Sequence, residues 1–269
     1  MNQQRILEII AASGLSAMVF TGCSKSDEEL WRDSNGTKGL INLEAVKTAY
    51  KKYRKVSDFE KRINEIYEGD NLVLLKSEGV KNGFKLSAYE DLDKDKKISP
   101  EKDDPLFTLT VQDGRCELKG MGKNSYYKDS WTYNVESERR YYRSHYHSGG
   151  FFFYSWYGYG SRWGGYYTPY SRYGSLYSSR NSYRGSSAFS TQVRSNNSFM
   201  GSMSRSKGTA FSATKTTSAR QSYVKKTSGS SSFSSKLNSS KRSSGWGKGS
   251  TRSSFGSSGS FRSSSGSSI

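Results

Sequence analysis

The stretch LFTLTVQDGRCELKG, residues 106–120, contains the clearest fold signal in the chain. Apolar and polar residues alternate on both sides of Asp113-Gly114, a dipeptide that is typical of the tight turn of a β-hairpin. We therefore expect the strands Leu106–Gln112 and Cys116–Gly122 to pair antiparallel, with one face of the pair buried. Cys116 then lies within a strand, where we expect a buried thiol rather than a disulfide between chains.

Two more strand patterns precede this hairpin. The apolar runs Asn71–Lys76 and Phe84–Glu90 have the length and the residue types of strands. Asn82-Gly83 stands between them and provides a second hairpin turn. Together the four runs predict a sheet of about four antiparallel strands.

Two helical patterns come before the strands. In each of them apolar residues recur at steps of three and four, which places them on one face of a helix. Ser57 and Glu60 have the spacing of a capping box at the start of the second helix, and Gly69 suits its end. The apolar faces consist of Leu43, Val46, Tyr50 and Tyr53 in the first segment and of Phe59, Ile63, Ile66 and Tyr67 in the second. Two helices followed by about four antiparallel strands predict a small α+β domain over residues 40–134.

The 269 residues have a net charge of +18, and the surplus lies in the C-terminal half. Residues 24–134 contain 21 Lys and Arg and 21 Asp and Glu, so this part is neutral. Residues 135–269 contain 20 Lys and Arg against only two acids, Glu136 and Glu138. A neutral domain followed by a cationic region explains this distribution better than a uniformly basic globular protein does.

The cationic half divides into an aromatic segment at 135–185, rich in Tyr, Gly and Arg, and a Ser/Gly/Arg/Lys-rich tail at 186–269. Aliphatic residues almost vanish from the first, and the isolated aromatic rings of the second follow neither a helical nor a strand period. The second segment, 186–269, offers too little apolar surface to offset its conformational entropy. We therefore predict a long disordered, low-complexity tail behind the folded domain.

Arginine and aromatic side chains are the binding groups of this cationic half. Arginine binds phosphate and carboxylate polymers with release of counterions, and contacts between guanidinium groups and rings favour self-association. The composition resembles that of the tails of RNA-binding and condensate-forming proteins, and a solvated spacer is the alternative. The candidate polyanion-binding residues are Arg139, Arg140, Arg143, Arg162, Arg172, Arg180 and Arg184.

Residues 1–22 have the organisation of a secretory signal. Arg5 precedes an apolar run that ends at Phe20 and is shorter than a membrane-spanning helix. The following residues, Thr21-Gly22-Cys23, complete a pattern that resembles the lipobox of bacterial lipoproteins. The resemblance implies cleavage before Cys23, acylation of that residue with palmitate-type chains, and stable anchoring in the membrane. The alternative is an N-terminal amphipathic helix with a buried cysteine.

Residues 23–39 form an acidic linker in this interpretation. Asp27, Glu28 and Glu29 resemble the acidic export signal of surface lipoproteins in the Bacteroidetes lineage, whereas a solvated linker of mixed charge is the alternative. Ser24 follows the cysteine directly, in place of the Asp that is associated with retention at the inner membrane. These features predict a lipid-anchored protein of the cell envelope, at the outer membrane.

A run of aspartates between two predicted strands is the best candidate site in the chain. Three of them alternate as positions 1, 3 and 5 of an EF-hand-type calcium loop: Asp91, Asp93 and Asp95. Lys96 replaces the usual Gly at position 6, and Lys102 replaces the usual Glu at position 12. We therefore expect a shifted acid, Asp103 or Asp104, to complete a weak calcium site, and calcium is the only cofactor indicated. A solvated charged loop is the alternative.

Residues with the pattern of a catalytic centre are absent from the sequence. There is no Ser-His-Asp set, no glycine-rich phosphate loop after a strand and no Cys/His zinc spacing, so we do not expect an enzyme. The lipid anchor and the basic tail predict an envelope protein that adheres to anionic polymers (polysaccharide, lipopolysaccharide or nucleic acid) or to copies of itself. If the N-terminus is not a signal, an intracellular nucleic-acid-binding or condensate-forming protein is the alternative.

Overall fold

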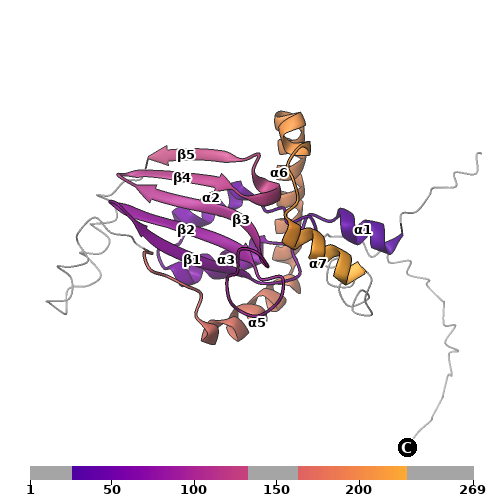
Figure 1. The fold of residues 1–269 in the computed structure, drawn as a ribbon, viewed down its shortest axis with the longest axis horizontal. Helices are drawn as coiled ribbons and strands as arrows, with labels where there is room; N and C mark the ends of the chain where they lie inside the picture. Colours follow the sequence, from indigo (N-terminus) through magenta and orange to yellow (C-terminus); the bar gives the residue numbers. More distant parts are fainter. Residues whose placement is uncertain (1–25, 133–162, 229–269) are drawn as a thin grey trace, which may run out of the picture.

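Five strands form one antiparallel sheet in which each strand pairs with the next along the chain (Figure 1). The computed structural model describes residues 26–132 and 163–228. The strands are β1 (Val73–Val80), β2 (Gly83–Glu90), β3 (Asp104–Gln112), β4 (Arg115–Gly120) and β5 (Lys128–Thr132). The four expected strands are confirmed, and β5 is an additional one that follows the short 3-10 turn η2 (Gly122–Asn124).

The two hairpins differ in how they use glycine. Asp113 and Gly114 both have positive φ, 48° and 75°, as a tight two-residue turn between β3 and β4 requires. In the first hairpin the turn is Lys81-Asn82, because Val80 already pairs with Gly83. Gly83 opens β2 instead, where a Cβ atom would lie 1.8 Å from the carbonyl oxygen of Val111 on β3. Gly83 therefore allows β2 and β3 to lie close together, and it is not part of the turn itself.

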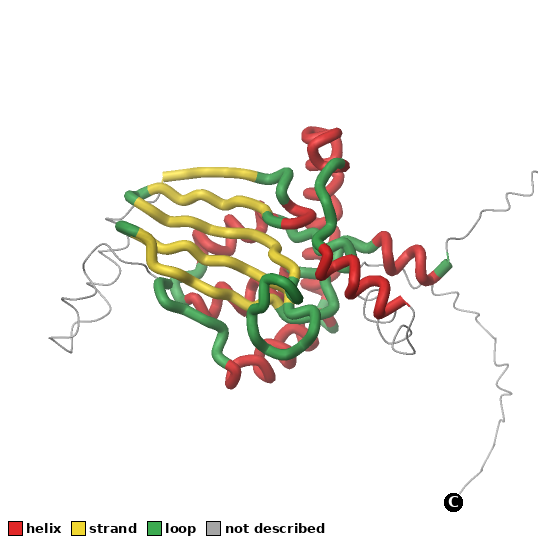
Figure 2. Tube along the Cα trace, in the orientation of Figure 1, coloured by secondary structure: helices red, strands yellow, loops and turns green. Residues whose placement is uncertain are grey.

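Helices α2 (Leu43–Lys52) and α3 (Val56–Ile66) cover one face of the sheet (Figures 1 and 2). Their apolar faces form the core with the inward side chains of the strands, as the periodicity predicts. Asn42 caps α2, since its side-chain oxygen accepts a hydrogen bond from the amide of Ala45 at 3.0 Å. The small α+β domain is thereby confirmed.

The expected capping box at the start of α3 is wrong. The helix begins at Val56, and Lys55 occupies the N-cap without a side-chain hydrogen bond. Glu60 is fully buried instead, and it accepts hydrogen bonds from Thr168, Tyr166 and Arg172 of the C-terminal half. The carboxylate of Glu60 therefore binds residues more than 100 positions away and does not bind the backbone at the start of its own helix.

The domain also begins earlier than expected. Ser26 and Glu29 form a capping box that starts α1 (Asp27–Asp33), and Trp31 of this helix is buried. The following loop packs so closely that a Cβ atom at Gly36 would lie 2.5 Å from the carbonyl oxygen of Glu68. Residues 26–39 therefore belong to the folded domain rather than to a free linker. The predicted signal peptide and Cys23 lie outside the described residues.

The largest correction concerns the C-terminal half, because residues 163–228 are folded onto the domain. They form the short turn η3 (Tyr170–Arg172) and three helices: α5 (Tyr173–Arg184), α6 (Ser187–Ser212, kinked at Gly208) and α7 (Ser218–Ser228). The prediction of disorder from residue 186 onward is wrong up to Ser228. Helix α6 alone buries Phe189, Val193, Phe199 and Met200. Residues 133–162 and 229–269 lie outside the described part of the chain.

Residues 166–168 bind the outer edge of β1. The amide of Ser77 donates to the carbonyl oxygen of Tyr166 at 2.7 Å, and the amide of Thr168 donates to that of Leu75 at 3.0 Å. Trp163 enters the core beside Phe59, with ring centroids 4.7 Å apart. This segment thus covers an edge whose backbone groups would otherwise lack partners.

Helices α5 and α6 bind the C-terminal end of α3. Asn196 donates to the carbonyl oxygen of Ile66 at 2.9 Å, and Arg184 donates to those of Tyr67 and Gly69 at 3.1 and 2.6 Å. These donors satisfy carbonyls that a helix end leaves without intrahelical partners. Asn196 also donates to the buried carboxylate of Glu68 at 2.8 Å. Burial raises the pKa of the Glu68 carboxyl to about 7, and the bond from Asn196 opposes this rise only in part.

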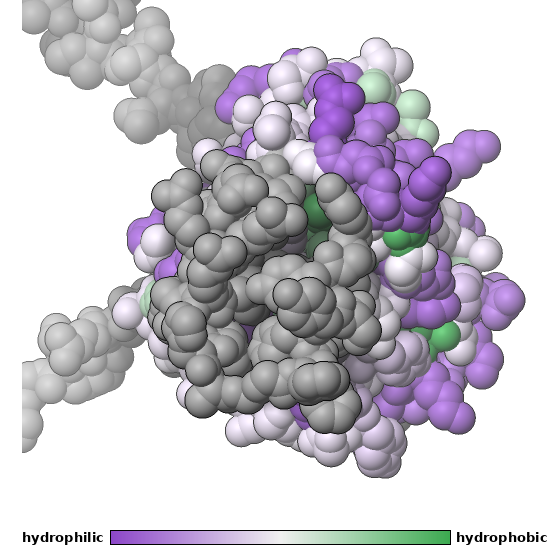
Figure 3. All heavy atoms as spheres, turned by 90° about the vertical axis from the view of Figure 1, so that its left-hand side faces the viewer, coloured by the Kyte–Doolittle hydropathy of each residue, from purple (hydrophilic) through white to green (hydrophobic). Residues whose placement is uncertain are grey.

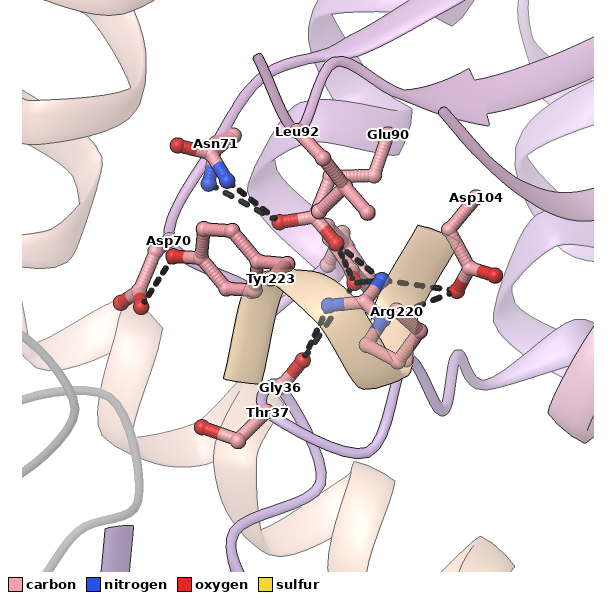
Figure 4. Close-up of polar contacts among 12 residues, drawn as sticks. Gly36, Thr37, Asp70, Asn71, Glu90, Leu92, Asp104, Arg220 and Tyr223 are labelled. Carbon is pink, nitrogen blue, oxygen red and sulfur yellow. Dashed lines mark hydrogen bonds and ion pairs between the residues drawn. The ribbon is translucent and has the colours of Figure 1, made fainter. Parts of the chain in front are cut away.

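Helix α7 is held by the most deeply buried cation in the described part of the chain. Arg220 is 1% exposed, and its guanidinium binds the carboxylates of Glu90 on β2 and Asp104 on β3 (Figure 4). It also donates to the hydroxyl of Tyr67 at 3.1 Å, while that hydroxyl donates to Glu90. Both acids raise the pKa of the Arg220 guanidinium, so it remains charged. The residue therefore joins the C-terminal helix to two strands and to the end of α3.

We expect Arg220→Met to lower the free energy of unfolding by about 3–5 kcal/mol, because it leaves Glu90 and Asp104 buried without their cation. Arg194→Met, on the exposed side of α6, is the matched control and should change stability by less than about 0.5 kcal/mol. Urea denaturation of the full chain measures both. Equal stability of the two variants would contradict a structural role for Arg220.

Glu68→Gln should stabilise the protein at neutral pH and above. The pKa of Glu68 is near 7 in the folded protein and near 4.5 when exposed, so the folded state binds the extra proton between these values. Wild-type stability therefore falls as pH rises through this window, by up to about 3 kcal/mol. The variant keeps an acceptor for Asn196 and should lose this dependence. Denaturation between pH 4 and 8 tests it, with exposed Glu101→Gln as the control, and parallel curves for wild type and Glu68→Gln would contradict the prediction.

Candidate functional site

The aspartate loop, residues 91–103, connects β2 to β3 and appears as a broad green loop beside the sheet in Figure 2. The structure brings together the three alternating carboxylates that the sequence singled out. One oxygen each of Asp91, Asp93 and Asp95 lies within 4.8 Å of the others. The spacing of the residues thus produces a shared carboxylate cluster in the folded protein.

Asp91 differs from its two partners because it is fully buried. Its Oδ2 atom accepts hydrogen bonds from the hydroxyl of Tyr173 at 2.8 Å and from the amide of Lys96 at 3.2 Å. Its Oδ1 atom is also buried but has no hydrogen-bond partner. Burial raises the pKa of the Asp91 carboxyl, and the bond from Tyr173 opposes that rise.

Asp93 and Asp95 are exposed and shape the loop through their own backbone. The Oδ1 atom of each accepts the amide two residues ahead, at 3.1 Å from Asp95 and 2.8 Å from Lys97. Lys96, at the position where such loops carry Gly, has a φ of 65°. The backbone therefore adopts the left-handed conformation of the loop type even without glycine, at a cost of about 1–2 kcal/mol.

Of the two acids expected to complete the loop, only Asp103 faces it. Asp103 is buried and accepts hydrogen bonds from the amides of Leu92 at 3.0 Å and Ser99 at 2.8 Å, so it closes the loop on itself. Burial raises the pKa of the Asp103 carboxyl to about 6. Asp104 is engaged instead by Arg220 and by the hydroxyl of Thr217.

Three tyrosines of the C-terminal half contact the aspartate loop. Besides the bond from Tyr173 to Asp91, the amide of Ile98 donates to the hydroxyl of Tyr167 at 2.6 Å. The ammonium group of Lys96 donates to the hydroxyl of Tyr170 at 3.1 Å and lies 4.3 Å from its ring centroid. The loop conformation is therefore supported by residues of the aromatic segment 135–185, which the sequence does not connect with the aspartate loop.

The proposed polyanion-binding arginines of this region have structural partners. Arg172 binds Glu60 at 3.1 Å, and Arg180 is buried with its guanidinium on the carbonyl oxygens of Asn71 and Asp70. Arg184 binds the end of α3, as described above. The expectation that these three arginines form a free cationic surface is corrected, because the fold uses them internally. Arg139, Arg140, Arg143 and Arg162 lie outside the described residues.

Other cations of the C-terminal half remain on the surface. Residues 163–228 contain ten Lys and Arg and no acid. Six of the ten are exposed on or between α6 and α7: Arg194, Arg205, Lys207, Lys215, Lys225 and Lys226. Figure 3 shows the face at the left of Figure 1, away from α6 and α7, where the described surface in view is mostly hydrophilic with only small apolar areas. The exposed large hydrophobic side chains of the described residues are all tyrosines: Tyr167, Tyr170 and Tyr177.

Sequence analysis missed the buried charges that organise the fold, namely Glu60, Glu90 and Arg220. No local spacing pairs them, since Arg220 lies 130 residues from Glu90 and Arg172 lies 112 residues from Glu60. Their sequence neighbourhoods give no signal either, because Glu60 lies beside Lys61 and Glu90 lies beside Asp91. Cys116 is a buried thiol in β4, as expected.

Comparison with protein-family models, curated proteins and solved structures finds no match for this chain. Among the helices of the described residues, none combines the length and apolarity that spanning a membrane requires. The functional argument therefore rests on the side chains and their geometry.

Proposed function

We propose that the protein is a non-enzymatic, lipid-anchored protein of the cell envelope that binds anionic polymers. Its mature chain begins at Cys23, whose acyl chains hold it at the membrane, and the outer membrane is the expected location. The binding groups are exposed Lys and Arg side chains of the C-terminal half. Suitable partners are acidic polysaccharide, lipopolysaccharide and extracellular nucleic acid, which all present repeated negative charges.

The observation that supports this proposal is that the charged side chains of α6, α7 and the residues between them are all positive. Their six exposed cations have no acidic residue within their own segment, as the sequence of 163–228 shows. The segment itself is fixed to a neutral domain by Arg172, Arg180, Arg184 and Arg220. A folded scaffold holds this positive charge in place, so less conformational entropy is lost on binding than with a free tail.

The exposed surface favours charge over apolar contact as the mode of binding. The described residues expose tyrosines rather than an aliphatic patch, and tyrosine rings stack on bases and sugars or contact arginine. Self-association through such contacts is a second outcome of the same chemistry. An intracellular nucleic-acid-binding protein would use the same surface, so lipidation decides between the two locations.

We expect the full chain to bind double-stranded DNA and polygalacturonate, but not neutral dextran, with an affinity that falls steeply as salt increases. Arg205→Gln, Lys207→Gln and Lys215→Gln together should weaken binding and reduce the slope of log K against log salt on DNA by about 2–3, because each phosphate contact contributes about 0.9. Fluorescence anisotropy at several salt concentrations measures the slope.

The matched control replaces Lys81, Lys85 and Lys119, which are exposed cations of the neutral half, by Gln. This control changes the net charge equally and should retain at least half of the affinity. Equal losses in both triple variants, or salt-independent binding, would contradict a specific basic surface.

A truncated variant for the same binding measurement should lack only residues 229–269, since deletion from residue 135 would also remove Thr168 and Arg220 from the core.

Acylation of Cys23 provides the test of location. Cells that express the full chain should incorporate labelled palmitate into it and recover it in the membrane fraction. Cys23→Ala should abolish both, whereas Cys116→Ala should abolish neither, because that thiol is buried in β4. An unlabelled full-length protein in the cytosol would instead support the intracellular alternative.

A further inference from the structure

The aspartate loop contains a buried oxygen that nothing in the described protein satisfies. Asp91 is 0% exposed, and its Oδ1 atom accepts no hydrogen bond. Tyr173 and the amide of Lys96 both bind Oδ2, and the amide of Lys94, which also lowers the pKa of this carboxyl, makes no hydrogen bond to Oδ1. A buried acceptor without a partner costs about 1–3 kcal/mol, and more when it is charged. This atom therefore points to a ligand that supplies positive charge.

The carboxylate that carries this oxygen belongs to a cluster that suits a cation. The carboxylates of Asp93 and Asp95 lie with that of Asp91 inside 4.8 Å, and both are exposed, so an ion has access from solvent. Among the described residues this is the one cluster of three or more potential metal-ligating side chains. It contains oxygen donors alone, which suits a hard cation rather than zinc or copper.

We infer that this loop binds one calcium ion through Asp91 Oδ1 and the carboxylates of Asp93 and Asp95. The position-7 residue of such loops contributes its backbone carbonyl, and here that residue is Lys97. Calcium fits better than magnesium because a flexible loop of carboxylates accommodates its larger and less regular coordination shell. Asp103 does not join the ligand set, since its two oxygens hold the amides of Leu92 and Ser99. Its role is to close the loop behind the ion.

The lysines of the loop set the affinity of the site. Lys102 lies 3.4 Å from Asp93 and is 62% exposed, so it competes weakly with a divalent ion for that carboxylate. Lys96 is turned toward Tyr170, as its 3.1 Å bond to that hydroxyl shows. We therefore expect a dissociation constant of about 10⁻⁴ to 10⁻³ M, as in extracellular calcium modules. This site is independent of the basic surface proposed above.

Calcium titration of the chelator-treated full chain tests the inference in the absence of any polymer. Calorimetry should give one binding event, and 10 mM calcium should raise the melting temperature by about 3–6 °C. Magnesium should bind at least about ten times more weakly. Hydrogen exchange should slow at residues 91–103 and at Tyr173, because the hydroxyl of Tyr173 donates to Asp91.

The decisive variant is Asp95→Asn, which keeps an acceptor for the amide of Lys97 but loses the ligand charge. It should weaken calcium binding at least about tenfold, whereas Glu101→Gln, which removes an equal charge at an exposed position of the same loop, should change it less than about twofold. Asp93→Asn serves as a second ligand variant, and melting in chelator confirms that each variant is folded. Absence of a calcium-dependent shift in the wild type, or equal calcium responses of Asp95→Asn and Glu101→Gln, would overturn the site. Either result leaves salt-dependent polymer binding unaffected.

Discussion

The burial of the Arg220 guanidinium between Glu90 and Asp104 is the constraint on which the arrangement of the domain depends. Neither carboxylate would be tolerated at the end of the sheet without a cation, and the cation comes from the last described helix. The same group restricts the loop before α2. Gly39 has a φ of 72°, and a Cβ atom there would lie 2.6 Å from Asp104 and 2.9 Å from the guanidinium. One charge network thus connects α7 to four other segments of the chain: β2, β3, the end of α3 and the loop before α2.

Other described contacts of the C-terminal half also join a polar donor to a buried acceptor, through hydrogen bonds rather than through a fully buried ion pair. Thr168, Arg184 and Asn196 attach the segment by donating hydrogen bonds to Glu60 or to backbone carbonyls at the edges of the domain. Apolar anchoring is limited to a few side chains, such as Trp163 and Phe199, spread over a long stretch. Polar side chains that satisfy buried partners supply the specificity that a large apolar face supplies elsewhere.

The sequence predicted those parts of the molecule whose signals are local. Alternation around Asp113-Gly114 and the apolar steps of the two helices predicted the sheet, the helices and their buried faces correctly. The spacing of Asp91, Asp93 and Asp95 also predicted that their carboxylates would meet. Composition failed for 186–228, because α6 buries only four apolar side chains along its whole length and α7 buries none, so neither helix has a strong apolar pattern. The partners of Glu60 and Arg220 were invisible for a different reason, since they lie more than 100 residues away.

The position of Arg220 near the end of the described chain has a consequence for the order of folding. Its contact with Glu90 closes a loop of 130 residues, and that with Gly36 spans 184 residues. Loops of this length make native contacts slow to form, because their entropy must be lost before any stabilisation is gained. A chain that emerges N-terminus first, from a ribosome or from a membrane pore, holds two unpaired acids at its sheet end until residue 220 has followed. The two carboxylates therefore gain their cation only after residue 220 is available, so the complete domain forms late in the emergence of the chain.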